Sequence, residues 1–237
     1  MYDRTYGRGR LCLMWEILPY EEDLGFHTQK NSVDVLNGGY HENFKEYIEN
    51  NLLDKITPNG RAIDGGASYG WFVPILYDFV DIIECFEIRT DVFNYLNRNM
   101  NKFGFDQVKT HNLGLSSYCG SAHHNIGLLR GKEHWTGSTQ IVDSNHPGAF
   151  ECSVVTLDSL NFDDVSFVKL DVEGHEVEAL RGAKNTIQTC RPICVVEHNK
   201  RTHISKKQDI LKYFSELNYN FFGARRLDMI FVPSEKI

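Results

Sequence analysis

The chain has 237 residues, of which 41% are hydrophobic and 24% are charged, and its net charge is −7. This length and balance indicate one ordinary globular domain with a sizeable core, and the negative charge argues against general nucleic-acid binding. No apolar run could span a bilayer and no charged-then-apolar leader follows Met1, so we expect a cytoplasmic protein without a membrane partner, its six scattered cysteines reduced.

Residues 1–40 lack periodicity but are rich in aromatic residues. This favours packing against a sheet edge, with a lid over a substrate as the alternative. From residue 41 a helix is predicted, because apolar residues repeat three and four apart. We predict one domain over 1–237, in which 1–55 form an N-terminal lid or helical extension. The remainder, 56–237, forms an α/β core that carries a β insertion at about 117–155.

The first unit of the core, over residues 61–80, is a strand, a glycine-rich turn and a helix. Glycines let the backbone turn sharply and approach a ligand, and the helix start offers unpaired N–H groups. Ala67 stands where a dinucleotide fingerprint needs its second glycine, so a nicotinamide oxidoreductase is disfavoured. What remains is the pattern Asp64-x-Gly66-x-x-x-Gly70.

The next units continue the α/β pattern. A second strand ends in Glu87, which lies at the distance expected of an acid that binds ribose hydroxyls. A helix over 90–103 and a third strand over 108–115 follow. Topology alone places Leu115 and Ser116, at the end of that strand, beside an adenine.

Residues 117–153 are predicted to add a β hairpin, because 138–142 and 149–155 resemble short strands. Four potential zinc ligands occur here: Cys119, His123, His124 and His134. Their spacing fits no usual zinc site, so we predict exposed loop histidines and no metal in this region.

Acids follow several strands of the predicted sheet. A strand over 166–170 runs into an acid, a glycine and a helix over 177–187, and a fifth strand follows. Three strand ends therefore carry carboxylates, namely Asp64, Asp171 and Glu197. In open α/β sheets, ligands bind at the carboxyl ends of the strands. A last helix and a terminal hairpin complete the predicted sheet.

Several motifs resemble those of the FkbM-type methyltransferases. They are Ile63-Asp64-Gly65-Gly66, Phe86-Glu87, Thr156-Leu157-Asp158 and Lys169-Leu170-Asp171-Val172-Glu173-Gly174-His175-Glu176, extended by Leu180-Arg181-Gly182-Ala183 and by Pro192 to Glu197. The resemblance covers about residues 60–200. It implies a class I Rossmann-like fold: a mostly parallel seven-stranded sheet with an antiparallel terminal hairpin strand and helices on both faces.

The resemblance also implies a reaction, which is methylation by S-adenosylmethionine (SAM), typically of a hydroxyl on a sugar or small metabolite. It assigns cofactor binding to Asp64, Gly65, Gly66, Ser68, Tyr69, Gly70, Glu87, Leu115, Ser116 and Asp171. The pairs Gly65-Gly66 and Ser68-Tyr69 depart from the usual family pattern. This departure leaves the acceptor open.

Asp171 is the first candidate for the base that takes the proton of a hydroxyl acceptor, because the end of the fourth strand faces the methyl group in this fold. Glu173 and His198 are the second candidates, as a base or a substrate anchor. Asp171, Glu173 and Glu197 could instead hold a divalent cation, for which their oxygens suit magnesium. A basic run over 200–207 is interpreted as a solvated face, with a site for an acidic acceptor group as the alternative.

Other classes of protein share the fold, which alone does not choose among them. A nucleic-acid base methyltransferase is disfavoured, because the chain has no adjacent prolines and no Pro-Cys pair. A non-catalytic SAM-binding module would keep Asp64, Gly66 and Glu87 but has no need for Asp171 and Glu173. We therefore predict a methyltransferase with a small-molecule or carbohydrate acceptor, with a non-catalytic SAM-binding module or a macromolecular acceptor as the alternatives.

Overall fold

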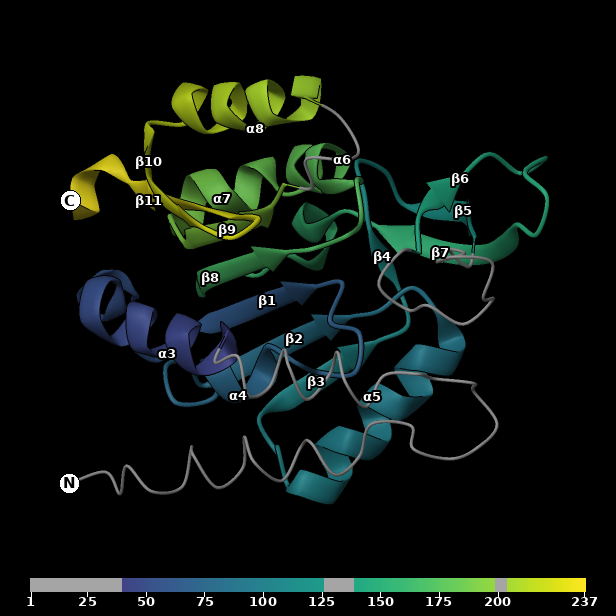
Figure 1. The fold of residues 1–237 in the computed structure, drawn as a ribbon, viewed down its shortest axis with the longest axis horizontal. Helices are drawn as coiled ribbons and strands as arrows, with labels where there is room; N and C mark the ends of the chain where they lie inside the picture. The colour runs from purple at the N-terminus through teal and green to yellow at the C-terminus, as the bar shows by residue number, and fades with distance from the viewer. Residues whose placement is uncertain (1–39, 126–138, 199–203) are drawn as a thin grey trace.

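The computed structural model describes residues 40–125, 139–198 and 204–237. Its main sheet has seven strands in the order β10-β11-β9-β8-β1-β2-β3 (Figure 1). They are β1 (Arg61–Gly65), β2 (Ile82–Phe86), β3 (Val108–His111), β8 (Val165–Leu170), β9 (Ile193–Glu197), β10 (Tyr219–Arg225) and β11 (Asp228–Pro233). Neighbouring strands pair in parallel except at β11, which is antiparallel to both β9 and β10. The predicted sheet with its antiparallel terminal hairpin is confirmed.

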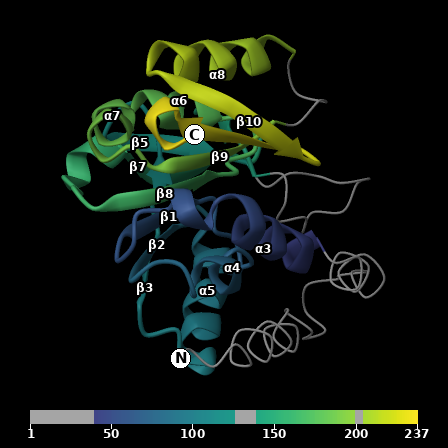
Figure 2. The same cartoon turned by 90° about the vertical axis from the view of Figure 1, so that its left-hand side faces the viewer.

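Helices cover both faces of this sheet (Figures 1 and 2). One face carries α3 (Tyr40–Asn51), α4 (Val73–Leu76) and α5 (Thr90–Phe103), and the other carries α6 (Glu176–Arg181), α7 (Lys184–Cys190) and α8 (Ile204–Glu216). Successive strand residues point to opposite faces, so Ala62 packs in the first core cluster and Ile63 in the second. The predicted apolar stripe of α3 is buried through Phe44, Ile48 and Leu52.

Two helices are shorter than their apolar patterns predicted. The helix after the glycine turn, α4, has four residues. The helix predicted over 177–187 is interrupted at Gly182. This glycine lies so close to the carbonyl oxygen of Ser116 that an added Cβ would overlap it. Asp158 then caps the second piece, α7, by accepting hydrogen bonds from two first-turn N–H groups at 2.8 and 3.0 Å. Short 3-10 turns occupy Leu53–Lys55, Leu157–Leu160 and Ser234–Lys236.

The predicted third strand is divided between two sheets. Its first part is β3, whereas Gly114–Leu115 form β4 of a second sheet with the order β4-β7-β5-β6. The other strands of this sheet are β5 (Gly120–His124), β6 (Ile141–Val142) and β7 (Phe150–Val155). Strands β6 and β7 lie within the segments predicted as strands, but they do not pair with each other as the predicted hairpin, because β5 lies between them. Strand β5 was not predicted, because its Gly-Ser-Ala-His-His sequence lacks apolar alternation.

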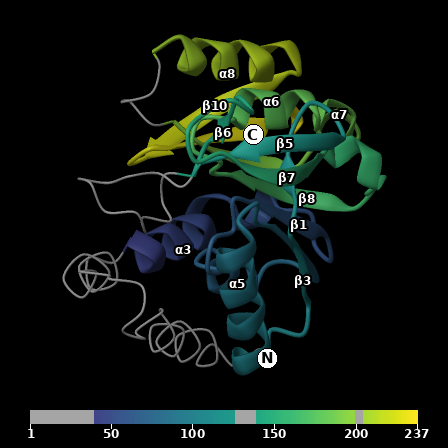
Figure 3. The same cartoon turned by 90° about the vertical axis from the view of Figure 1, so that its right-hand side faces the viewer.

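The order of the strands reverses between β1 and β8. From β1 the chain proceeds through β2 to β3, and it later returns to β8 on the other side of β1 before it continues to β9. Open α/β sheets bind ligands outside the carboxyl ends of the strands at such a point. The second sheet lies toward this same edge, on the side to which the arrows of β1 and β8 point (Figures 1 and 3).

Predictions for residues 1–39, including the lid, lie outside the described residues, as do those for 126–138 and 199–203. The cysteines of the described ranges are free thiols: Cys85, Cys119, Cys152, Cys190 and Cys194. Within the same ranges, no helix combines the length and the apolar character needed to cross a membrane.

Candidate functional site

The glycine turn begins at the end of β1 and is closed by backbone hydrogen bonds. The N–H groups of Gly66 and Ala67 both donate to the carbonyl oxygen of Phe86 at 2.9 Å, and the N–H of Gly70 donates to Ala67 at 2.8 Å. Gly66 has a φ of +81°, and an added Cβ would overlap the carbonyl oxygen of Asp171. The position requires glycine, so the turn contacts the backbone that follows β8.

Glu87 follows β2 and is held by two backbone N–H groups. Its Oε2 accepts a hydrogen bond from Ser68 at 3.0 Å, and its Oε1 accepts one from Arg89 at 2.8 Å. Burial raises the pKa of Glu87, and these two hydrogen bonds oppose the rise. The carbonyl of Tyr69, a buried residue, accepts a hydrogen bond from Asn99 at 2.8 Å. The structure thus brings together the glycine turn and the acid predicted for ribose.

Leu115 and Ser116 lie at the start of the second sheet and not at the end of β3, which corrects their predicted position. Both are buried. A Cβ added to Gly65, at the end of β1, would lie 3.0 Å from Leu115 Cδ1. Ser116 Oγ is 3.0 Å from Nε2 of His175, which follows β8. Leu115 and Ser116 are thus reached through β4 and not through an extended β3, but they still lie against the loops after β1 and β8.

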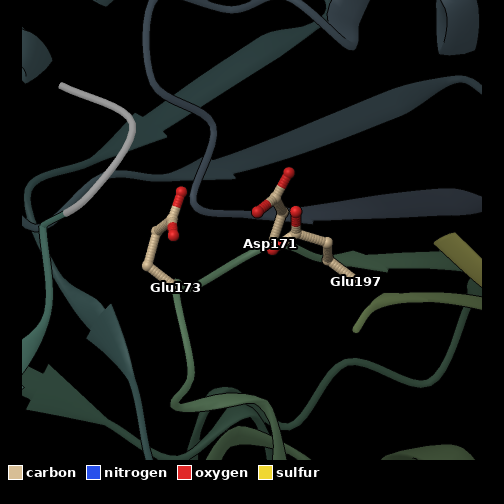
Figure 4. A group of neighbouring side chains, drawn as sticks. All are labelled: Asp171, Glu173 and Glu197. Carbon is tan, nitrogen blue, oxygen red and sulfur yellow. The ribbon is translucent and has the colours of Figure 1, made fainter. Parts of the chain in front are cut away.

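Three carboxylates gather at the ends of β8 and β9. Ligand oxygens of Asp171, Glu173 and Glu197 lie within 4.8 Å of one another (Figure 4). Burial raises the pKa of Glu173 to about 8 and that of Glu197 to about 9, and the charge of Asp171 adds to both increases. At pH 7 the carboxyl groups of Glu173 and Glu197 therefore hold their protons most of the time. We call these three side chains the acidic cluster.

Glu173 is presented by a loop with an uncommon backbone. Its φ is +53° and that of Gly174 is +102°. Glu176 supports this loop, because its Oε1 accepts hydrogen bonds from the N–H groups of Val172 at 3.2 Å and Gly174 at 2.9 Å. Gln140, just before β6, donates to the carbonyl oxygen of Glu173 at 3.2 Å. The last acid of the Asp-x-Glu-Gly-x-Glu motif therefore shapes the loop that carries the second.

Two further residues belong to this charged region, and the sequence had suggested a role for neither. Lys169 Nζ lies 3.0 Å from Asp171 Oδ2 and 3.4 Å from Asp228 Oδ1. A signal for both was present. Lys169 precedes Asp171 by two residues, and side chains two residues apart along an extended chain point to the same face of a sheet. Asp228 begins an antiparallel strand and pairs with Glu197, so it lies at the edge where the parallel strands end.

Asp64 is 2% exposed, and its Oδ2 has no hydrogen-bond partner among the described residues. Burial raises its pKa to about 7, while the charge of Lys169 opposes the rise and that of Asp171 adds to it. A buried acceptor without a partner is unfavourable, so the position suits a ligand that brings a donor or a positive charge.

His198 is half-buried, and its backbone N–H donates a hydrogen bond to the carbonyl oxygen of Leu227 at 2.7 Å. This bond ties the end of β9 to the terminal hairpin.

The acidic cluster matches magnesium in the type of its oxygen donors. The cation that the structure sets against Asp171, however, is the ammonium of Lys169, and Asp171 also forms a hydrogen bond with Glu197. These contacts balance part of the negative charge. We therefore assign no metal to the cluster, and metal dependence stays a prediction that a chelator tests.

Solved structures share this fold. The methyltransferase FkbM of Methylobacillus flagellatus KT has a TM-score of 0.52 and 14% identity over 95% of this chain, which spans 58% of the length of that protein. The magnesium protoporphyrin IX methyltransferase of Synechocystis PCC 6803, solved with bound SAM, has a TM-score of 0.50 and 14% identity. That match covers 94% of this chain and 91% of the other. At such identities the likeness shows the fold alone.

Sequence comparison is more specific. No curated protein matches the chain. Residues 82–221, more than half of the chain, match the model of the methyltransferase FkbM domain. The matched range begins after the glycine turn and includes β2, the second sheet, the acidic cluster and the start of β10. The chain therefore belongs to the FkbM methyltransferase family, as the motifs in its sequence predicted.

Proposed function

We propose that the chain is a SAM-dependent methyltransferase that methylates a hydroxyl group of a sugar or another small metabolite. The observation that carries this proposal is the meeting of a glycine turn, an N–H-bound acid and an acidic cluster at the point where the strand order reverses. SAM supplies a methyl group on a positively charged sulfur. The remaining chemistry falls to the side chains at this edge of the sheet.

On the cofactor side, the unpartnered oxygen of Asp64 suits the ammonium of the methionine part. The oxygens of Glu87 keep lone pairs beyond the two that accept backbone N–H groups, and a ribose diol offers two hydroxyl donors to them. Leu115 provides an apolar wall for the adenine. Gly66 lets the backbone of the turn come close to the loop after β8.

On the acceptor side, the side chain of Asp171 is 39% exposed and takes the proton that leaves the hydroxyl. The raised pKa values of Glu173 and Glu197 keep both groups protonated at neutral pH. The proton of Glu197 serves its hydrogen bond with Asp171, whereas Glu173 can donate a hydrogen bond to an oxygen of the acceptor. Methyl transfer is an in-line displacement, so fixed positions of donor and acceptor supply much of the acceleration. His198 remains a second candidate for base or anchor.

Calorimetric titration with SAM tests the cofactor part of the proposal, and methyl transfer to a panel of hydroxylated sugars tests the acceptor part. We expect Glu87→Gln to weaken SAM binding about 10-fold to 100-fold, and Asp171→Asn to keep SAM binding but to lose methyl transfer. Asp164→Asn is the matched control, because Asp164 pairs with Arg61 at the opposite edge of the sheet. SAM binding without transfer to any small hydroxyl compound would favour a macromolecular acceptor or a non-catalytic module. Failure of the intact protein to bind SAM would reject the proposal.

A further inference from the structure

A buried lysine connects the acidic cluster to the terminal hairpin. The side chains of Lys169 and Asp228 are each 5% exposed, whereas that of Asp171 is 39% exposed. The three groups thus lead from the interior to the site, as carboxyl, ammonium and carboxyl, with spacings of 3.4 and 3.0 Å. Burial raises the pKa of Asp228 to about 7, so its carboxylate form prevails above that pH. Lys169 Nζ also lies 5.5 Å from the ring centroid of Phe72, so an apolar ring covers another side of the ammonium.

The charge of Lys169 acts on the whole site. It lowers the pKa of Asp64, Glu173 and Glu197, against the burial that raises all three. Four elements supply the carboxylates around it: β1, the loop after β8, β9 and β11. Among the described residues, no other cation lies within ion-pair distance of Asp171. An ammonium that is buried between two carboxylates holds both in fixed positions, because three N–H donors need acceptors there.

We propose that Lys169 is a positioning residue of the transfer site: it holds the carboxylate of Asp171 toward the position of the transferred methyl group, while Asp228 anchors the ammonium from the interior. This inference rests on the proposed function. It assigns a task to the terminal hairpin, because β11 delivers the anchoring carboxylate beside the end of β9. Lys169 acts through Asp171 and does not itself touch the acceptor.

A merely electrostatic role of Lys169 predicts the opposite result and a merely structural role predicts no change in relative affinity, which makes the inference testable. By simple Coulomb attraction, removing an ammonium near the site leaves it more negative, and a ligand with a positive charge should then bind more tightly. If Lys169 positions Asp171, its removal releases the carboxylate that faces the charge, and such a ligand should bind more weakly. The sign of the change separates the two roles.

The experiment compares two ligands by calorimetry at pH 7.5: S-adenosylhomocysteine, which is neutral at sulfur, and sinefungin, which carries an amine where SAM carries its methyl group. The ratio of their Kd values reports the negative charge at the methyl position, because general loosening of the site affects both ligands alike. We expect Asp171→Asn to lower the preference for sinefungin about tenfold, the size of one hydrogen bond to a charged group. Lys169→Met should lower it equally, and the double variant should lower it no further.

Lys169→Arg should restore the preference to within about threefold of the wild type, because it returns a cation with N–H donors. Arg61→Met is the matched control: it removes a cation that pairs with Glu84 and Asp164 at the opposite edge of the sheet, and the preference should not change. If Lys169→Met does not fold, Asp228→Asn replaces it, since loss of the anchor should also lower the preference.

The inference is overturned if the preference for sinefungin over S-adenosylhomocysteine stays constant or rises in Lys169→Met. It is also overturned if this preference stays constant in Asp228→Asn. If Asp171→Asn lowers the preference and the lysine variants do not, only this inference fails. If the intact protein binds neither ligand, the proposed function fails and the inference fails with it.

Discussion

Asp64→Asn should stabilise the protein without cofactor at alkaline pH, although it removes a charge from the proposed cofactor site. Asp64 is buried, and its pKa is raised from 3.8 to about 7. Because the folded state binds this proton more tightly than the unfolded state does, the contribution of Asp64 to stability is greatest below pH 4. It falls as the pH rises to about 7 and is constant above that.

Between low and high pH, the contribution of Asp64 to the free energy of unfolding changes by about 4 kcal/mol in total, since each tenfold change in proton affinity is worth about 1.4 kcal/mol. Between pH 5 and pH 8 the wild type should lose about 3 kcal/mol through this group, and Asp64→Asn should lose none of it. Any constant effect of burying an amide cancels when the two pH values are compared.

Urea unfolding followed by circular dichroism at pH 5 and pH 8 measures this change, with Asp164→Asn as the control for loss of a carboxylate outside the site. Saturating SAM should then raise the stability of the wild type at pH 8 more than that of Asp64→Asn, because a ligand that binds only the folded state stabilises it. If the stability difference between wild type and Asp64→Asn is the same at both pH values, the reasoning on burial is wrong.

Three further changes separate cofactor binding from stability. Gly66→Ala should abolish SAM binding in calorimetry, because its Cβ would overlap the carbonyl oxygen of Asp171 at a φ of +81°; unchanged binding would show that the two loops can separate. Glu87→Gln should weaken SAM binding about 10-fold to 100-fold, through loss of charged hydrogen bonds, with a smaller effect on the melting temperature. Asp158→Ala should lower the free energy of unfolding by about 1 kcal/mol through loss of the cap of α7, and an effect on SAM affinity would contradict this purely structural role.

The sequence predicted the parts of the fold that local patterns determine. Alternating apolar residues and acid-ended strands located β1, β2, β8 and β9, and the edge rule for open sheets brought Asp171 and Glu197 to one place. What it missed depends on contacts between distant segments. One such contact is the close approach of Gly182 to the backbone of Ser116, at the position where the predicted helix is interrupted, and helical periodicity does not record it.

The roles of Lys169 and Asp228 were missed for a related reason. An apolar strand pattern treats a lysine as an interruption, yet here two carboxylates stabilise its burial. Asp228 lies more than 50 residues after Asp171 in the chain, and only the antiparallel pairing of β11 with β9 brings it to the same edge. An acid at the start of an antiparallel strand lies at the same edge as an acid at the end of a parallel strand, so both are equally good candidates for site residues.

The contact between the loops after β1 and β8 has a consequence for how such a protein can diversify. The N–H of Asp171 donates to the carbonyl of Gly65 at 2.9 Å, and Gly66 leaves no room for a side chain between the two backbones. The segment proposed to hold the cofactor and the segment that carries the proposed base are thus fixed to each other. We expect new acceptor preferences to arise from changes in segments that contact these two loops without being part of them. One example is the segment before β6, whose Gln140 donates a hydrogen bond to Glu173. The methyl donor and the chemistry would then be inherited together, and evolution would act on the choice of acceptor alone.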